Sequence, residues 1–343
     1  MRKTGIITFH RASSYGAVMQ SLALQKAVES LGSEVEIINY HSPGMSQQKP
    51  IFSEFCDKHL RMTKFYSDAG AIEEKQYDAV ITGSDQVWNT NLIKDPAFFL
   101  SFVKGNAKKI AYSASVGINK ELSSQLDEKM FADYIPEFDS ISVRERVHVP
   151  YVQQFAKGEV CATIDPVFLL QSEDYDQLFG NDWEGETAKK DRGKYIFYHG
   201  VGLSAKLVDF LNLLSAYSGY PVIAITDYEK YHFGRNTTIM QNVPPEKWVS
   251  YIKNAELVLT NSYHTMLFAI LYGVPFYAYT AKQHANVTRL LEVLDTLGLH
   301  ERKLMNVSGV SKTSFEMDYT KAYGQLREKR EYSYEYLRNA IMQ

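Results

Sequence analysis

Cysteine is scarce in this chain, because only Cys56 and Cys161 occur among its 343 residues. The two lie far apart and have no metal-ligand spacing, which argues against a disulfide scaffold and a cysteine-based metal centre and fits a reducing compartment. No other acidic or histidine cluster has metal-ligand spacing either. A surplus of positive charge is also absent, since the formal net charge is −3. Nucleic acid is therefore not an expected partner.

Long apolar runs are missing as well. No stretch approaches the roughly 20 apolar residues that a transmembrane helix needs. The apolar run that follows Met1 is too short for a signal peptide, so residues 5–9 are expected to form a strand instead. We expect a cytoplasmic protein, which could still contact the inner membrane face as a peripheral protein.

Apolar runs alternate with helical patterns along most of the chain, which is typical of α/β domains with largely parallel sheets. In the first half, the pattern predicts strands at residues 5–9, 35–40, 78–82, 110–114 and 140–143, and helices at 16–31 and 122–138. In the second half, it predicts strands at 195–199, 222–226, 257–260 and 276–279, and helices at 205–217, 245–255, from 263, at 287–297 and at 322–342.

A cluster of Glu, Asp, Gly and Lys at residues 171–193 interrupts this alternation and predicts a linker or a surface excursion. Since domains have roughly 150 residues, we expect one α/β domain at 1–170, a second at 194–310, and a helical tail at 311–343 that packs back on the body. Ligands of such open sheets bind outside the carboxyl ends of the strands, so the two domains would face a cleft.

The most informative segment is residues 257–276, a buried strand followed by a polar turn and a helix that begins after Ser262. A hydroxyl residue at a helix start leaves backbone N–H groups pointing forward, and the helix dipole favours an anion there. His264 lies in the first turn, where its ring could give a proton to a bound anion; a purely structural histidine is the alternative. The segment predicts an enzyme that acts on a phosphorylated or carboxylated donor.

Three cationic residues could help to bind such a donor. Arg144 follows the strand at 140–143, Lys282 follows the strand at 276–279, and Arg289 lies in the next helix. Arginine matches carboxylate and phosphate groups in a bidentate geometry. Each of the three could instead be a surface cation of little energetic consequence. We predict that Arg144, Lys282 and Arg289 bind the donor together with Ser262.

A polar turn with Ser14, Tyr15 and Gly16 follows the first predicted strand, and Gln20 comes one helical turn later. This junction has neither the GxGxxG fingerprint nor the lysine of a P-loop, which disfavours NAD, FAD and ATP. A ligand could approach the backbone at the glycine, although an ordinary serine-capped turn would give the same pattern. We predict that these four residues contact an acceptor.

A second polar turn follows the strand at 78–82 and contains Ser84, Asp85 and Trp88. A carboxylate, a hydroxyl and a flat apolar ring together suit a ligand that is rich in hydroxyl groups. The alternative is a capped turn with a tryptophan that fills the core. We predict acceptor binding by Ser84 and Trp88 and a catalytic role for Asp85.

Five short segments together carry a resemblance to a known family. They are YGAVMQSLAL at residues 15–24, GSDQVWN at 83–89, SVRE at 142–145, DP at 165–166 and SYH at 262–264. In this order they resemble the polysaccharide pyruvyl transferase family, over about residues 5–299. The resemblance implies a GT-B-like fold of two Rossmann-like domains that face a cleft. It also implies transfer of pyruvate from phosphoenolpyruvate onto a sugar as a cyclic ketal, with no essential metal and no other cofactor.

The resemblance places His264 at the histidine of the family's Ser-x-His segment and Arg144 at the arginine after the fifth strand, whereas Lys282 is a looser match. Tyr263 and Thr265 differ from the residues that many members carry on either side of the histidine. We predict that His264 is the general acid and that Asp85 positions an acceptor hydroxyl or takes its proton.

Two alternatives stay open at this stage. One is a GT-B-type glycosyltransferase that uses a nucleotide-sugar donor, and the other is a non-catalytic sugar- or anion-binding relative. The expected partner is a sugar or glycan acceptor. The sequence does not say which sugar this is, which pair of hydroxyls is joined, whether the acceptor is lipid-linked, or what the oligomeric state is.

Overall fold

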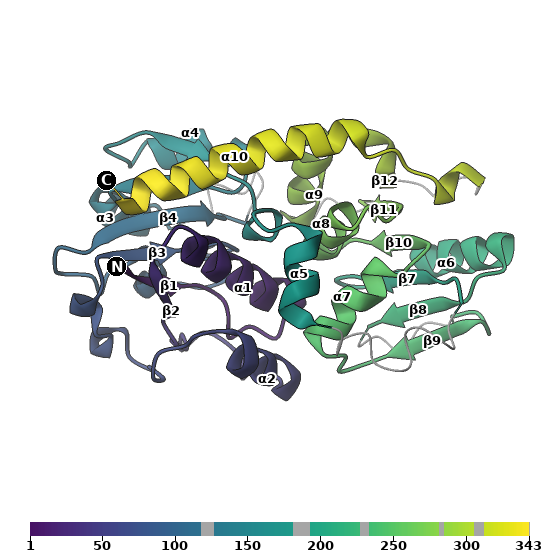
Figure 1. Cartoon of the computed structure of the whole chain (residues 1–343), viewed down its shortest axis with the longest axis horizontal. Coiled ribbons are helices and arrows are strands. Elements are labelled where there is room, and N and C mark those ends of the chain that lie inside the picture. The colour runs from purple at the N-terminus through teal and green to yellow at the C-terminus, as the bar shows by residue number, and fades with distance from the viewer. Residues whose placement is uncertain (118–126, 181–192, 227–232, 281–284, 305–311, 343) are drawn as a thin grey trace. The chain divides into compact units, whose positions relative to one another are not determined.

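A computed structural model describes residues 1–117, 127–180, 193–226, 233–280, 285–304 and 312–342 (Figure 1). The chain divides into two compact units. Unit 1 is Met1–Leu170 with Arg327–Gln343, and unit 2 is Gln171–Leu326. Each unit contains a six-stranded sheet in which all neighbouring strands are parallel. This confirms the predicted α/β class.

The sheet of unit 1 has the strand order β2-β1-β3-β4-β5-β6. Its strands are β1 Lys3–Ile7, β2 Glu34–Ile37, β3 Ala79–Thr82, β4 Lys108–Ala114, β5 Ser140–Val143 and β6 Val160–Ala162. Its helices are α1 Tyr15–Ser30, α2 Pro50–His59, α3 Glu128–Tyr134 and α4 Val149–Gln153. All four residues of β3 are buried, as expected for a central parallel strand that is covered on both faces.

The sheet of unit 2 has the order β12-β11-β10-β7-β8-β9. Its strands are β7 Ile196–His199, β8 Val222–Ile225, β9 Thr237–Met240, β10 Leu257–Thr260, β11 Phe276–Tyr279 and β12 Lys303–Leu304. Its helices are α5 Ser172–Phe179, α6 Ala205–Ser218, α7 Pro245–Lys253, α8 Tyr263–Leu271 and α9 Ala285–Thr296, and α10 Thr320–Met342 ends the chain.

Most of the expected elements are present, and β5, β10 and β11 have the predicted bounds. Short elements were not predicted, namely α2, α4, β6, β9 and β12. Helix α5 occupies part of the segment that we predicted to be a linker or excursion, and residues 181–192 of that segment lie outside the described residues. The helix predicted at 122–138 is described from residue 127, where Asp127 caps α3 by accepting a hydrogen bond from Met130 N.

The end of α10 packs against unit 1, as predicted for the tail. The Tyr336 hydroxyl donates to the carbonyl oxygen of Ala111 in β4 at 2.8 Å. The hydroxyl oxygen of Ser333 accepts a hydrogen bond from the backbone N–H of Ile164 at 3.1 Å. These contacts use polar groups on one face of the helix, so the helix is fixed to the sheet by specific bonds as well as by apolar packing.

The core of unit 1 is centred on Trp88, whose side chain is fully buried. Its ring stacks on Phe99 with a centroid distance of 5.6 Å, and Phe131 and Phe138 meet it edge-on. Its indole N–H donates to the carbonyl oxygen of Phe98 at 3.2 Å, so the one polar group of the ring is satisfied inside the core.

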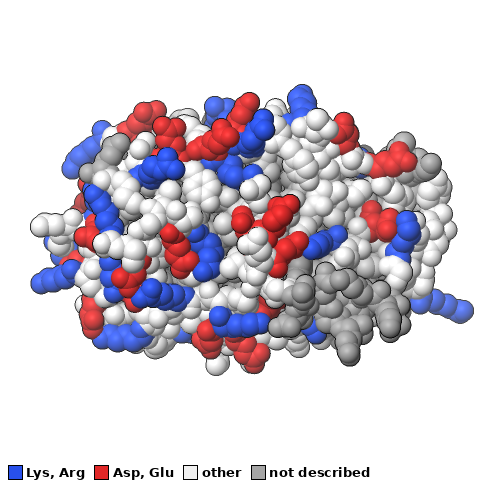
Figure 2. All heavy atoms as spheres, in the orientation of Figure 1, with Lys and Arg blue, Asp and Glu red and all other residues white. Residues whose placement is uncertain are grey.

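Two properties of the described residues bear on possible partners, namely the apolar character of the helices and the distribution of surface charge. No helix in the described ranges is long and apolar enough to cross a membrane. Figure 2 shows basic and acidic side chains mixed over the visible face.

Candidate active site

The turn that leads into α8 is held by hydroxyl groups. Thr260, the last residue of β10, accepts a hydrogen bond from Ser262 N at 2.9 Å and donates to the carbonyl oxygen of His199 at 2.6 Å. Ser262 caps α8, with its hydroxyl oxygen 3.5 Å from Thr265 N. The remaining N–H groups of the first turn point out of the helix end, which makes this spot favourable for an anion.

Thr265 connects the start of α8 to the neighbouring strand. It is fully buried, and its hydroxyl lies 2.7 Å from Nδ1 of His199 at the end of β7. β7 and β10 are adjacent, and Thr260 pairs with His199 in register. We did not predict His199 as a site residue. His199 is the last residue of a predicted strand, and it lies on the same edge of the sheet as Ser262. This position was the feature of the sequence that could have identified His199 as a site residue.

His264 lies in the first turn of α8 with 8% of its surface exposed. Its ring meets that of Tyr263 at 87° with a centroid distance of 5.0 Å. The guanidinium carbon of Arg289, from α9, lies 5.6 Å from the centroid of the Tyr263 ring. The structure therefore brings together His264, Ser262 and Arg289 from the predicted set. Lys282 lies outside the described residues.

Asn261 closes the loop after β7 beside this helix start. Its Oδ1 accepts a hydrogen bond from Val201 N at 2.7 Å, and its Nδ2 donates to the Val201 carbonyl oxygen at 2.8 Å. A Cβ atom at Gly200 would lie 2.1 Å from Asn261 Oδ1, so a side chain at this position would displace the Asn261 amide. The loop thus depends on Gly200 and Asn261, neither of which we predicted as a site residue.

Arg144 follows β5 in unit 1, and its side chain is only 2% exposed. One terminal nitrogen donates to Asp165 Oδ2 at 2.9 Å, and Nε donates to Glu145 Oε1 at 3.0 Å. Its other terminal nitrogen lies 3.8 Å from Asp85 Oδ1. Arg144 and Asp85, predicted for different roles, are therefore members of one buried charge cluster with Glu145 and Asp165.

The cluster extends beyond these four residues through Glu145. The Ser115 hydroxyl donates to Glu145 Oε1 at 2.9 Å, and His148 Nδ1 lies 3.4 Å from Glu145 Oε2. Three carboxylates thus surround one guanidinium group, so a donor anion would have to compete with them for Arg144. Donor binding by Arg144 stays a prediction, and the contacts favour a role in holding the carboxyl ends of β4 and β5.

The residues around Asp85 fix its backbone conformation. Asp85 has a φ of 69°, and its Oδ1 accepts a hydrogen bond from the N–H of Gln86 at 2.9 Å. Gly83 has a φ of 115°, and a Cβ there would lie 2.2 Å from the carbonyl oxygen of Tyr112. A side chain at residue 83 would collide with β4, so the turn that presents Asp85 requires glycine.

Ser84 and Gln20, both predicted to contact an acceptor, are fully buried. The Ser84 hydroxyl donates to the carbonyl oxygen of Ser113 at 2.9 Å. Gln20 donates to Thr8 Oγ1 at 2.8 Å and accepts from Ser84 N at 3.2 Å. Their polar groups are engaged within unit 1, so they tie α1 to the ends of β1 and β3.

The other predicted acceptor residues have different surroundings. Ser14 is exposed and caps α1 without a side-chain hydrogen bond. Tyr15 is buried and packs edge-on against Phe52 at 5.0 Å, and Gly16 is buried behind it. Trp88 lies in the core. Among these residues only Ser14 is exposed, so acceptor binding by Tyr15, Gly16 and Trp88 stays a prediction that their burial does not favour.

His10, in the turn that follows β1, is a buried titratable group that we did not predict. Its ring nitrogens lie 3.1 Å from the Thr8 carbonyl oxygen and 3.3 Å from Asn39 Oδ1. Burial lowers the pKa of His10 from its ordinary value of 6.5 to about 4, because the charged ring would lose its hydration. No group of three or more potential metal ligands is found in the parts of the chain that the structure describes.

Comparison with solved structures identifies the architecture. A putative UDP-N-acetylglucosamine 2-epimerase from Listeria monocytogenes has a TM-score of 0.60 and 12% identity, over 98% of this chain and 90% of that chain. The enzyme of this kind from Neisseria meningitidis, bound to UDP-GlcNAc, has a TM-score of 0.58 and 10% identity, over 98% and 94%. A UDP-glucosyltransferase from Polygonum tinctorium has a TM-score of 0.51 and 10% identity, over 99% and 98%. These likenesses show a GT-B-like fold.

The family comparison is more specific than the structural one. No curated protein sequence matches the chain. The model of the family described as polysaccharide pyruvyl transferase matches residues 15–282, which is well over half of the chain and includes both His264 and Arg144. The chain therefore belongs to the polysaccharide pyruvyl transferase family and is a transferase.

Proposed function

We propose that the protein transfers pyruvate from phosphoenolpyruvate to two hydroxyls of one sugar in a glycan, and that His264 is the general acid. The observation that carries the proposal is the position of His264 in the first turn of α8, in a member of the pyruvyl transferase family. Histidine is the side chain that most readily exchanges protons near neutral pH, as a general acid must.

The start of α8 also suits the donor, which carries a carboxylate and a phosphate. The positive end of the helix dipole favours an anion beside Ser262. The guanidinium of Arg289 is held over the Tyr263 ring, which is next to His264. Arg289 is buried, and a cation in such surroundings interacts with an anion more strongly than a solvated one. We therefore assign Ser262 and Arg289 to the donor.

The proposed reaction balances as follows. His264 gives a proton to the methylene carbon of phosphoenolpyruvate, which becomes a methyl group. The oxygen of a sugar hydroxyl bonds to the neighbouring carbon and loses its proton to a base. The bond from that carbon to the phosphate oxygen then breaks and phosphate leaves. A second hydroxyl bonds to the same carbon and closes the ketal, and its proton goes to solvent.

The test compares His264→Gln with the wild-type protein in a transfer assay. Purified protein is incubated with phosphoenolpyruvate and a panel of oligosaccharide acceptors, and both phosphate release and the ketal methyl signal in proton NMR are followed. His264→Gln should lower turnover about 100-fold or more, the scale of a lost general acid. His300→Gln is the matched control, because His300 lies in the same unit with a side chain 67% exposed. Turnover of His264→Gln within a few-fold of that control would remove His264 from the chemistry.

Donor binding is tested separately by thermal stability. Millimolar phosphoenolpyruvate should raise the melting temperature of the wild type, because a ligand that binds only the folded state stabilises it. Arg289→Gln should reduce this rise, and Arg235→Gln, at an exposed position of unit 2, should keep it. If nucleoside diphosphates stabilise the protein and phosphoenolpyruvate does not, the nucleotide-sugar alternative replaces this proposal.

A further inference from the structure

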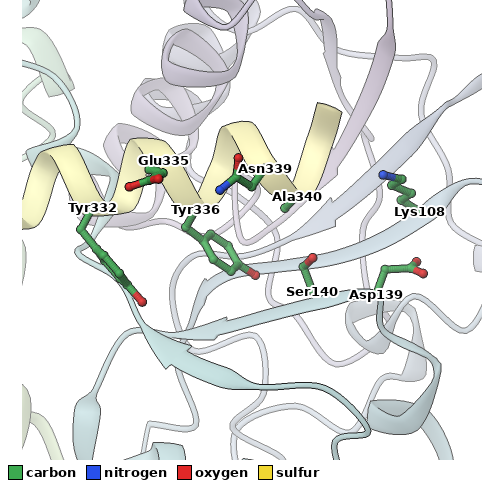
Figure 3. A pocket seen from close by; sticks show the side chains of 8 residues that line it. All are labelled: Lys108, Asp139, Ser140, Tyr332, Glu335, Tyr336, Asn339 and Ala340. Atoms are coloured by element: carbon green, nitrogen blue, oxygen red, sulfur yellow. The ribbon is translucent and has the colours of Figure 1, made fainter. Parts of the chain in front are cut away.

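A pocket of about 500 Å³ lies in unit 1 between α10 and the beginnings of β4 and β5 (Figure 3). Tyr332, Glu335, Tyr336 and Asn339 line it from the helix, and Lys108 and Asp139 line it from the sheet edge. Its volume is within the range of pockets that bind small molecules.

This pocket lies at the edge of the unit 1 sheet that is opposite to Arg144. Lys108 is the first residue of β4, and Asp139 directly precedes β5. Arg144 follows the last residue of β5. Because all strands of the sheet are parallel, their amino ends share one edge and their carboxyl ends share the other. β4 has seven residues, so the two edges are separated by roughly 20 Å along this strand.

Two tyrosines form the helix side of the pocket. Tyr332 and Tyr336 are four residues apart, which places them on one face of α10. The Tyr336 hydroxyl donates to Ala111, and its ring lies 6.2 Å from that of Tyr112. Tyr332 is 48% exposed, and its interaction with the Cys161 thiol raises the pKa of its hydroxyl. The pocket therefore offers the exposed ring of Tyr332 beside the ring of Tyr336, which its hydroxyl fixes to β4.

The polar side chains around these two tyrosine rings include both positively and negatively charged groups. Lys108 supplies a donor, Asp139 and Glu335 supply acceptors, and Asn339 supplies both (Figure 3). Asp139 Oδ2 also accepts a hydrogen bond from Lys109 N at 2.8 Å, which orients its carboxylate. Two carboxylates and one ammonium group do not favour an anion. An uncharged ligand that has an apolar face and many hydroxyls would match both the ring and the polar groups.

We propose that the pocket is a second saccharide-binding site, which holds a sugar of the glycan acceptor on the sheet edge opposite to Arg144. The inference rests on the proposed function in one respect, namely that the acceptor is a glycan. A second site of this kind raises the effective concentration of a long acceptor near the enzyme without a new contact at the site of transfer.

The experiment measures saccharide binding in the absence of phosphoenolpyruvate. The probes are hexasaccharides of glucose, galactose and N-acetylglucosamine, and binding is followed by saturation-transfer NMR and calorimetry. Tyr332→Ala should raise the Kd of the bound probe at least ten-fold, whereas Tyr332→Phe should stay within three-fold because it keeps the ring. Asn339→Ala, at an exposed position, should also weaken binding. Tyr217→Ala is the matched control, because Tyr217 is 54% exposed on α6, outside the pocket.

The outcomes separate this inference from the proposed function. Binding that depends on Tyr332 and persists in His264→Gln supports the second site, even if the wild type forms no ketal. The inference is overturned if no probe binds the wild type. It is also overturned if folded Tyr332→Ala and Asn339→Ala, checked by circular dichroism, bind as tightly as Tyr217→Ala.

Discussion

Removal of the Arg144 side chain should destabilise unit 1 far more than removal of an ordinary surface arginine. Its side chain is 2% exposed, and its two closest partners, Asp165 and Glu145, have side chains that are 0% and 3% exposed. Arg144→Ala would leave these carboxylates buried without their cation. Breaking a buried ion pair in this way costs about 3–5 kcal/mol, so we expect the free energy of unfolding of unit 1 to fall by that amount.

Arg61→Ala is the matched control for this prediction. Arg61 belongs to the same unit and pairs with Glu34, but its side chain is 55% exposed. Exposed pairs contribute about 0–1 kcal/mol, because both charges are already well hydrated. The two variants remove the same side chain and differ in burial, so the difference between them isolates the effect of desolvation.

The assay should report on unit 1 alone, because a chain with two units need not unfold in one step. Native-state hydrogen exchange of peptides from β4 and β5 measures the opening free energy of that sheet directly. Adding Asp165→Asn to Arg144→Ala should recover part of the loss, since it removes one unpaired charge and keeps an oxygen that can accept from Val167 N. A loss below about 1 kcal/mol in Arg144→Ala, equal to that in Arg61→Ala, would refute the reasoning.

Two further predictions concern His10 and Gly83. The pKa of His10 is about 4 in the folded protein and 6.5 when solvated. The stabilising contribution of the neutral ring is therefore fully present above pH 6.5. This contribution, about 3 kcal/mol, is lost as the pH falls towards 4. Urea unfolding of His10→Gln should lack that part of the pH dependence, and an unchanged slope would contradict it. Gly83→Ala should cost about 2 kcal/mol or more through its collision with Tyr112, whereas Gly158→Ala, with open space around it, should change the melting temperature little.

The sequence was most informative where an apolar run ends sharply at polar residues. β5, β10 and β11 were predicted with their observed bounds. The start of α8 was predicted as well, because Ser262 at the end of a buried strand gives a strong local signal for a helix cap. Information of this kind lies within a few neighbouring residues and needs no knowledge of the rest of the fold.

Three of the four edge strands in the two described sheets, β6, β9 and β12, could not be predicted in the same way, whereas the edge strand β2 was. β9 is partly exposed along its whole length, β6 has three residues and β12 has two, so none of them carries a long apolar run. They form because a neighbouring strand offers unpaired backbone groups. That is a property of the assembled sheet, which a local pattern does not contain.

The surroundings of the predicted site residues depended on long-range contacts. The pairing of Arg144 with Asp165 joins residues 21 positions apart, and the burial of Trp88 results from aromatic residues that come later in the sequence. From sequence alone, a strand-end arginine or tryptophan is equally compatible with a ligand and with a protein partner. The contacts decide which partner is present, and they favour structural roles for Trp88, Gln20 and Ser84.

Electrostatics favours unit 2 as the side that binds the donor. In unit 1, three carboxylates gather around Arg144, and this excess of negative charge would repel a donor that carries both a carboxylate and a phosphate. In unit 2, His264 lies at the positive N-terminal end of α8, and the guanidinium of Arg289 lies over the ring of the neighbouring Tyr263. The start of α8 therefore suits the anionic donor of the proposed reaction better than the surroundings of Arg144 do.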